Sequence, residues 1–188
     1  MTPSPATDTV STALLIIDVQ RALTTGQWAA FDSPGVVQRI NRVARLVRSA
    51  GAPVIAIQHE GPDSPLEYGT DDWQLDADLD VTAEDIRLRK TASDSFHNTK
   101  LHAVLQERGV TSLIVCGLQS DFCVDSTVRR ALALGYPVTL VSDGHTTVDN
   151  SVLSAAQISA HHNITLAGLD SYGPRVHAVP AADVRIER

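Results

Sequence analysis

The sequence predicts an α/β fold, a three-layer α/β/α sandwich around a central, mainly parallel sheet of six strands. Short apolar runs alternate along the chain with longer stretches whose apolar residues recur at helical spacing. The apolar runs are continuous, as in strands buried on both faces of a parallel sheet, and several helical stretches end at a glycine. With 188 residues, 43% of them hydrophobic, the chain is long enough to build one substantial core.

Strands and helices are expected in alternating order. The first strand, Ala13 to Asp18, precedes a helix that Ser33 caps and that has Pro34 in its first turn. The other strands are expected over 53–57, 86–90, 112–117, 137–141 and 164–167, and the helices over 34–49, 100–108, 121–134 and 150–161. Such alternation implies parallel strands joined by right-handed crossovers, so a ligand should bind beyond the carboxyl ends of the strands.

Three segments fall outside this alternation. Residues 1–11 are rich in proline, serine and threonine and are predicted to be a flexible N-terminus, which leaves 12–188 as a single domain. The segment 60–82 holds six aspartates among glycines and prolines, and we expect a long ordered excursion with a functional role. The tail 169–188 is a candidate for packing across a subunit interface.

Bulk composition argues against several classes of protein. The net charge of −7 disfavours a nucleic-acid partner, because such proteins usually present a basic face. No apolar run approaches the roughly 20 residues that span a bilayer, and the first residues lack a signal-peptide pattern, so a cytoplasmic protein without membrane association is expected. The two cysteines, Cys116 and Cys123, are too few for a disulfide scaffold and too widely spaced for a CxxC redox motif.

Reactive side chains fall at the ends of three predicted strands or just beyond them. Asp18 ends the first strand, Lys90 ends the third, and Cys123 follows the fourth by six residues at the start of a helix. Parallel strands end at the same edge of a sheet, so these groups should meet there. A thiol, an ammonium and a carboxylate can together carry out nucleophilic catalysis, with Asp18 moving the proton of Cys123. Lys90 and the helix N-terminus would favour the thiolate.

Each of these residues has a simpler interpretation when taken alone. An aspartate that closes a strand is often a turn residue or helix cap, a lysine after a short strand is usually a solvated charge, and a single cysteine is often a packing residue. Their joint placement at matching strand ends favours catalysis. Cys116, inside an apolar run, is expected to be a buried inert thiol, Asp143 to cap a turn, and His145 to be a surface or hydrogen-bonded histidine.

Three segments carry a recognisable pattern: ALLIIDVQ over 13–20, RKTASDSFHNT over 89–99 and VCGLQSDFCV over 115–124. They resemble the opening strand, the lysine segment and the nucleophile loop of the isochorismatase-like superfamily of cysteine hydrolases. The resemblance covers about residues 12–168 and implies the same sandwich fold. It also implies that the ordered aspartate, lysine and cysteine form a catalytic triad.

The nucleophile loop of that superfamily usually contains a cis peptide bond, and Leu118-Gln119 occupies its place here. The resemblance then implies that the backbone N–H groups of Gln119 and Cys123 form an oxyanion hole.

Four residues are expected to contact a substrate: His59, Trp73, Phe96 and Leu118. Core packing explains Phe96 and Trp73 equally well. Nicotinamidases of the superfamily bind a metal after the second strand through an aspartate and nearby histidines. Here His59 stands where that aspartate would fall, and no other histidine follows before the lysine segment. We therefore expect neither a metal nor another cofactor, and His59 either contacts the substrate or merely ends a strand.

The retained cysteine and the resemblance predict a hydrolase that cleaves a C–N bond of a small-molecule amide, carbamoyl compound or lactam through a Cys123 thioester. Within the superfamily, the chain looks most similar to the nicotinamidase-related group of small amidohydrolases, which includes streptothricin-hydrolase-like enzymes. Two alternatives stay open: vinyl ether hydrolysis of the isochorismatase type, and a non-catalytic binding scaffold. A homo-oligomer, either a dimer or a tetramer, is expected because related folds commonly oligomerise.

Overall fold

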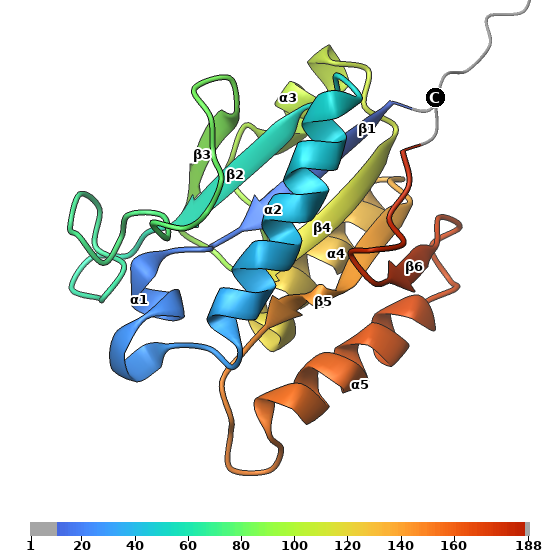
Figure 1. The fold of residues 1–188 in the computed structure, drawn as a ribbon. Coiled ribbons are helices and arrows are strands. Elements are labelled where there is room, and N and C mark those ends of the chain that lie inside the picture. Colours follow the sequence, from blue (N-terminus) through green and yellow to red (C-terminus); the bar gives the residue numbers. More distant parts are fainter. Residues whose placement is uncertain (1–10, 187–188) are drawn as a thin grey trace, which may run out of the picture.

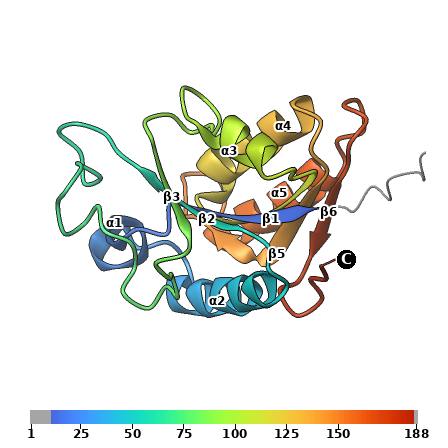
Figure 2. The ribbon, with the colours of Figure 1, turned by 90° about the horizontal axis from the view of Figure 1, so that it is seen from above.

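The chain forms a parallel sheet with helices on both faces (Figures 1 and 2). A computed structural model describes residues 11–186. Its strands are β1 (Thr12–Ile17), β2 (Val54–His59), β3 (Ile86–Lys90), β4 (Ser112–Leu118), β5 (Val138–Thr146) and β6 (Val176–Val179). Its α-helices are α1 (Arg21–Thr24), α2 (Ser33–Ser49), α3 (Leu101–Glu107), α4 (Asp125–Ala133) and α5 (Ala155–Ala167).

The strand order is β3-β2-β1-β4-β5-β6, and every neighbouring pair is parallel. From β1 the chain winds outward to β3, returns to β4 beside β1, and then winds outward in the other direction to β6. Doubly wound sheets bind ligands beyond the carboxyl ends of the strands at such a reversal, which here lies between β1 and β4. The predicted fold class is confirmed.

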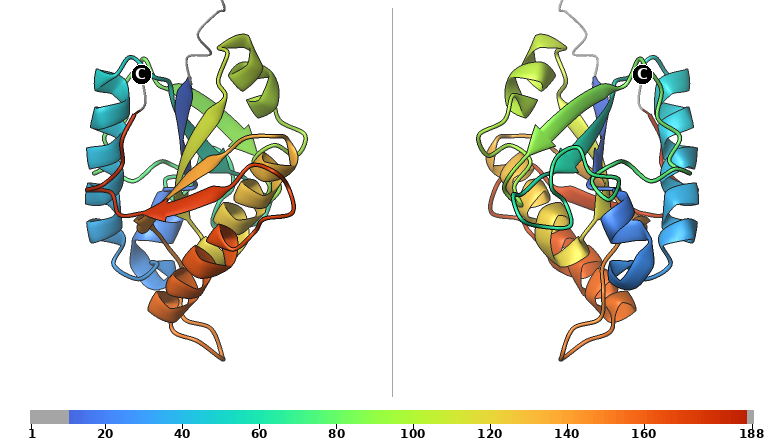
Figure 3. Two further views of the ribbon diagram at one scale, coloured as in Figure 1. Left: turned by 90° about the vertical axis from the view of Figure 1, so that its right-hand side faces the viewer. Right: turned by 90° about the vertical axis from the view of Figure 1, so that its left-hand side faces the viewer.

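Alternate side chains of β1 enter two separate cores. Ala13, Leu15 and Ile17 pack on the side of α3 and α4, whereas Leu14 and Ile16 pack under α2. All five are at most 1% exposed. Figure 3 shows the resulting layers, with α2 on one face of the sheet and α3, α4 and α5 on the other. Because both faces are covered, an uninterrupted apolar run is required in this strand.

The predicted strand over 164–167 is wrong, because these residues form the last turn of α5. A short apolar run fits a helix as well as a strand, and here Leu166 faces the core while Ile164 is 77% exposed. The sixth strand is β6, within the tail that we named as a candidate for packing across a subunit interface. This tail packs on its own sheet, since β6 pairs with β5 and Val184 is buried in the core under α2.

Three helix starts also differ from expectation, and the helix expected over 150–161 is α5, which begins at Ala155. The residue at the N-cap of α2 is Asp32, and the Ser33 hydroxyl donates instead to the Ala30 carbonyl, at 2.7 Å. The expected helix over 121–134 is divided into a π-helical turn, Ser120–Val124, followed by α4. We call Ser120–Val124 the nucleophile turn because it carries Cys123.

The long segment after β2 is ordered and lies against the chain that follows β1 (Figure 1). Backbone hydrogen bonds run from Arg21 N to Gln74 O at 2.9 Å, from Ala22 N to Asp72 O at 3.0 Å, and from Asp76 N to Val19 O at 2.9 Å. These bonds hold the segment beside α1 at the carboxyl edge of the sheet.

Within residues 11–186, none of the helices combines the length and the apolar character needed to cross a membrane. Residues 1–10, most of the predicted flexible N-terminus, lie outside the described residues. The assignment of 12–188 to a single domain stays a prediction.

Candidate active site

The structure brings Asp18, Lys90 and Cys123 together at the carboxyl edge of the sheet. Asp18 follows β1 directly, Lys90 is the last residue of β3, and Cys123 lies in the nucleophile turn after β4. Asp18 has a positive φ of 50°, a conformation that aspartate tolerates better than most residues. Its backbone N–H donates to Ile57 O at 2.9 Å, which ties the end of β1 to β2.

The Lys90 ammonium is the centre of the site. Its Nζ lies 2.7 Å from Asp18 Oδ2 and 3.2 Å from Cys123 Sγ. It also lies 3.1 Å from His59 Nδ1 and 3.0 Å from the Ala92 carbonyl oxygen. The Lys90 and Asp18 side chains are 0% and 1% exposed, so the buried positive charge has a carboxylate as its direct partner.

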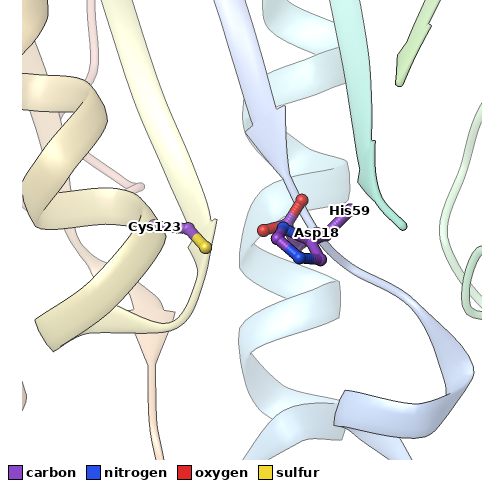
Figure 4. Close-up of side chains that lie close together, drawn as sticks. All are labelled: Asp18, His59 and Cys123. Carbon is purple, nitrogen blue, oxygen red and sulfur yellow. The ribbon is translucent and has the colours of Figure 1, made fainter. Parts of the chain in front are cut away.

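Asp18, His59 and Cys123 come from three neighbouring elements and converge (Figure 4). Their ligand atoms lie within 4.8 Å of one another. An oxygen, a nitrogen and a sulfur ligand of this kind suit zinc. However, the Lys90 ammonium contacts all three side chains, so a cation of the protein itself already lies among them.

Burial raises the pKa of the Cys123 thiol to about 12, the negative charge of Asp18 adds to this rise, and Lys90 opposes it. The thiol is therefore protonated near neutral pH, contrary to the expectation that Lys90 and a helix N-terminus would favour the thiolate. Attack by Cys123 then requires a base that removes the proton, and the Asp18 carboxylate is adjacent.

Burial and the charge of Lys90 lower the pKa of His59. A neutral His59 accepts the hydrogen bond from Lys90 at Nδ1, so its own proton is on Nε2. His59 thus offers one N–H donor at the edge of the site.

The predicted cis peptide bond, Leu118-Gln119, lies directly before the nucleophile turn. The Gln119 carbonyl accepts hydrogen bonds from the N–H groups of Phe122 and Val124, both at 3.1 Å. Just before the cis bond, Gly117 has a φ of 121°, and a Cβ there would lie 2.0 Å from Ile17 O. Only glycine therefore lets β4 approach β1 this closely.

Trp73 lies in the long segment after β2, and its backbone is bound to the carboxyl end of β2. Its carbonyl oxygen accepts hydrogen bonds from Gln20 Nε2 at 2.8 Å and from Gln58 Nε2 at 3.1 Å. The indole ring packs edge-on against Tyr68, with ring centroids 4.8 Å apart. Its Nε1–H is buried without a hydrogen-bond partner among residues 11–186.

Phe96 and Leu118 lie deeper than the other two predicted substrate contacts. Phe96 is 7% exposed and stacks on Tyr136, with ring centroids 6.2 Å apart, and Leu118 is fully buried. Both belong to the packed cores.

Sequence reasoning missed Gln20, which joins three segments of the site. This buried side chain donates to the carbonyl oxygens of His59 and Trp73, and its Oε1 accepts from His59 N at 2.8 Å. The available signal was a polar residue three positions beyond the apolar run that ends at Ile17.

Three residues near β4 and β5 can be compared with expectation. Cys116 is fully buried, as predicted, and burial raises the pKa of its thiol. His145 is hydrogen-bonded and 3% exposed, so it is not a surface residue. The prediction that Asp143 caps a turn is wrong, because it lies within β5 and its Oδ1 accepts from Ala181 N at 2.7 Å.

Known proteins resemble this chain over most of its length. The family model of the isochorismatase domain matches residues 12–166. A streptothricin hydrolase from Streptomyces noursei is 35% identical over 176 residues, covering 89% of this chain and 64% of that protein. A ureidoacrylate amidohydrolase from Caulobacter vibrioides is 32% identical over 173 residues, covering 72% of this chain and 77% of that protein.

Solved structures of isochorismatase-family proteins share the fold of this chain. The crystal structure of an isochorismatase from Pseudomonas putida KT2440 superposes with a TM-score of 0.85 at 31% identity, covering 98% of this chain and 94% of that one. The chain spans less than two thirds of the length of the streptothricin hydrolases that it matches, 64% of one and 55% of another. The family model nevertheless matches residues 12–166, which is most of the chain, and this match shows that the chain belongs to the isochorismatase family.

Proposed function

We propose that this chain is a cysteine hydrolase that cleaves a C–N bond of a small amide, carbamoyl compound or lactam through a thioester on Cys123. The observation that carries the proposal is the buried Lys90 ammonium, which contacts both the Asp18 carboxylate, at 2.7 Å, and the Cys123 sulfur, at 3.2 Å. The relatives named streptothricin hydrolase and ureidoacrylate amidohydrolase support hydrolysis as the reaction class.

In the acylation step the Cys123 thiol gives its proton to Asp18. With a thiol pKa of about 12, only about one molecule in 10⁵ would hold a free thiolate at pH 7. Deprotonation by Asp18 therefore accompanies attack of the sulfur on the substrate carbonyl carbon. The ammonium of Lys90 offsets the negative charge that develops on the sulfur.

The tetrahedral intermediate carries its negative charge on the former carbonyl oxygen. In this proposal the backbone N–H groups of Gln119 and Cys123 donate to that oxygen. Collapse breaks the C–N bond while Asp18 returns the proton to the departing nitrogen. Asp18 then accepts a proton from the water that attacks the thioester carbonyl carbon. Collapse of this second intermediate breaks the C–S bond, and Asp18 returns the proton to the sulfur, which releases the acid and restores the thiol.

Polar and apolar groups around the thiol would select the substrate. The buried Trp73 Nε1–H lacks a partner among the described residues, and the His59 tautomer carries its proton on Nε2, so both are candidate donors to a substrate oxygen. Phe96 and Leu118 would shape the floor. The mechanism uses Lys90 as its positive charge and needs neither a metal nor another cofactor.

The test is hydrolysis of a panel of small amides, ureides and lactams that includes ureidoacrylate and streptothricin. The readout is the amine or ammonia that hydrolysis produces. Cys123→Ala should abolish turnover, because Cys123 is the thiol that contacts Lys90. The matched control, Cys116→Ala, removes a thiol on a neighbouring segment and should retain turnover. Activity should also survive exhaustive chelation. Rapid quenching and intact-protein mass spectrometry should show an acyl adduct on Cys123.

Three results would overturn the proposal. Near-normal turnover by Cys123→Ala would remove the thiol from the mechanism. Pyruvate release from isochorismate without any adduct would favour vinyl ether hydrolysis. A protein that hydrolyses neither substrate class and whose Cys123 is unreactive would favour a binding scaffold.

A second copy of the chain is the protein partner that we expect, in a cytoplasmic dimer or tetramer. Large apolar side chains are exposed on the described surface, with Trp28 at 57%, Phe31 at 58% and Phe122 at 54%, and exposed apolar groups of this size favour association. Light scattering coupled to size-exclusion chromatography tests this, and a mass equal to one chain would contradict it.

A further inference from the structure

A buried chain of hydrogen bonds lies behind the nucleophile turn. Ser120 Oγ is 2.7 Å from His145 Nδ1 and 2.9 Å from Ser159 Oγ. On the other side of the imidazole, His145 Nε2 is 2.9 Å from Asn163 Oδ1, and Asn163 Nδ2 donates to Ser142 O at 2.9 Å. The turn is thereby linked to β5 and α5, neither of which contributes to the proposed triad.

The direction of every bond in this chain follows from its last member. Because Asn163 donates through Nδ2, its Oδ1 faces His145 and can only accept, so Nε2 of a neutral His145 carries the proton. The bare Nδ1 then accepts from the Ser120 hydroxyl. Ser120 has no second proton to donate, so Ser159 donates to Ser120.

The surroundings of His145 keep it neutral. Its side chain is buried, and this burial, together with the charge of His162, lowers its pKa, while the bond to Asn163 and the charge of Asp143 oppose the shift. The other charged groups at the small cleft that borders it, Asp32 and Arg39, pair with each other at 2.6 Å. The imidazole is therefore available as a hydrogen-bond acceptor near neutral pH.

We propose that His145 and Asn163 act as positioning residues that hold the nucleophile turn through Ser120. Ser120 is the first residue of the turn, directly follows Gln119 and is fully buried, so its bond to His145 fixes the start of the turn. That anchor keeps the partly buried Cys123 in place against the Lys90 ammonium. The inference rests on the proposed function only in assigning Cys123 as the nucleophile.

Loss of this anchor has a consequence at the thiol that a general loss of stability would not produce. Burial and the charge of Asp18 are the two influences that most raise the pKa of the Cys123 thiol. A turn that relaxes weakens both, because it moves Cys123 away from Asp18 and toward water. The pKa of the thiol should then fall, and each unit of that fall gives about tenfold more thiolate at a fixed pH. Alkylation should become faster while hydrolysis becomes slower.

The experiment measures the rate at which iodoacetamide alkylates Cys123 in the folded full chain between pH 6 and pH 10, with tandem mass spectrometry to separate Cys123 from Cys116. The variants are Ser120→Ala and His145→Leu, which remove the bond, and His145→Asn, whose Oδ1 can still accept from Ser120. Tyr136→Phe is the matched control, because it removes another hydroxyl–histidine bond, 3.1 Å from Tyr136 Oη to His102 Nδ1, away from the turn.

Ser120→Ala and His145→Leu should raise the alkylation rate at pH 8 by about tenfold or more and move the profile to lower pH. His145→Asn should stay within about threefold of wild type, and Tyr136→Phe should be unchanged. Against a hydrolysed amide, the first two variants should lower kcat more than they change KM.

Equal alkylation rates in wild type and folded Ser120→Ala would overturn the inference. So would a His145→Asn rate that matches His145→Leu, since the acceptor at this position would then be irrelevant. Alkylation requires no substrate, so these outcomes are independent of whether the protein hydrolyses an amide.

Discussion

Replacing Lys90 by methionine tests the buried ion pair directly. The substitution keeps most of the apolar stem of the side chain but leaves the Asp18 carboxylate, only 1% exposed, without its cation. Breaking a buried pair by removing one partner costs about 3–5 kcal/mol, a large part of the roughly 5–15 kcal/mol that stabilises a typical domain. The lost donors to His59 Nδ1 and the Ala92 carbonyl add to this cost.

The assay is urea unfolding followed by tryptophan fluorescence, at one protein concentration for all variants. Lys90→Met should lower the free energy of unfolding by about 3–5 kcal/mol, whereas Lys100→Met, at an exposed position, should change it by less than about 0.5 kcal/mol. Adding Asp18→Asn to Lys90→Met should recover part of the loss, because the uncompensated charge is gone. A Lys90→Met variant as stable as wild type would refute the reasoning.

Three further predictions concern the thiol, the close strand contact and the buried histidine. Alkylation of wild-type Cys123 should quicken about tenfold per pH unit from pH 7 to pH 10, because its thiol pKa is about 12; a plateau below pH 9 would contradict this pKa. Gly117→Ala should destabilise the protein by about 3 kcal/mol or more in thermal denaturation, since its Cβ would lie 2.0 Å from Ile17 O. Gly135 also has a positive φ but open space around it, so Gly135→Ala is the control. An equal loss of stability in Gly135→Ala would show that the contact with Ile17 O does not cause the destabilisation. Because burial lowers the pKa of His145, the unfolded chain binds this proton first, and stability should fall as pH drops below about 6.5, by at most about 1.4 kcal/mol per pH unit from this group. In urea titrations His145→Asn should show a shallower acid dependence, and an unchanged slope would argue against the shift.

The sequence alone was sufficient for the fold class and for the edge at which the reactive groups meet. A run such as Ala13–Ile17 without a polar interruption requires cover on both faces, which in practice means a parallel sheet between helices. Parallel strands then place their carboxyl ends together, so Asp18 and Lys90 could be assigned to one edge before any distance was known. The place of the cis bond at Leu118-Gln119 followed from the resemblance to a family.

Other features depended on contacts between distant segments, which only the tertiary structure decided. Residues 164–167 could pair as a strand or continue a helix, and the choice depended on which neighbours buried Leu166. The raised pKa of Cys123 reflects burial, and burial is a property of the assembled turn, not of the residues next to it in the chain. The bonds of His145 to Ser120 and Asn163 likewise join positions 25 and 18 residues apart. Local pattern identifies which faces must be buried, but hydrogen-bond partners and electrostatic environment are set by the packing of those faces against one another.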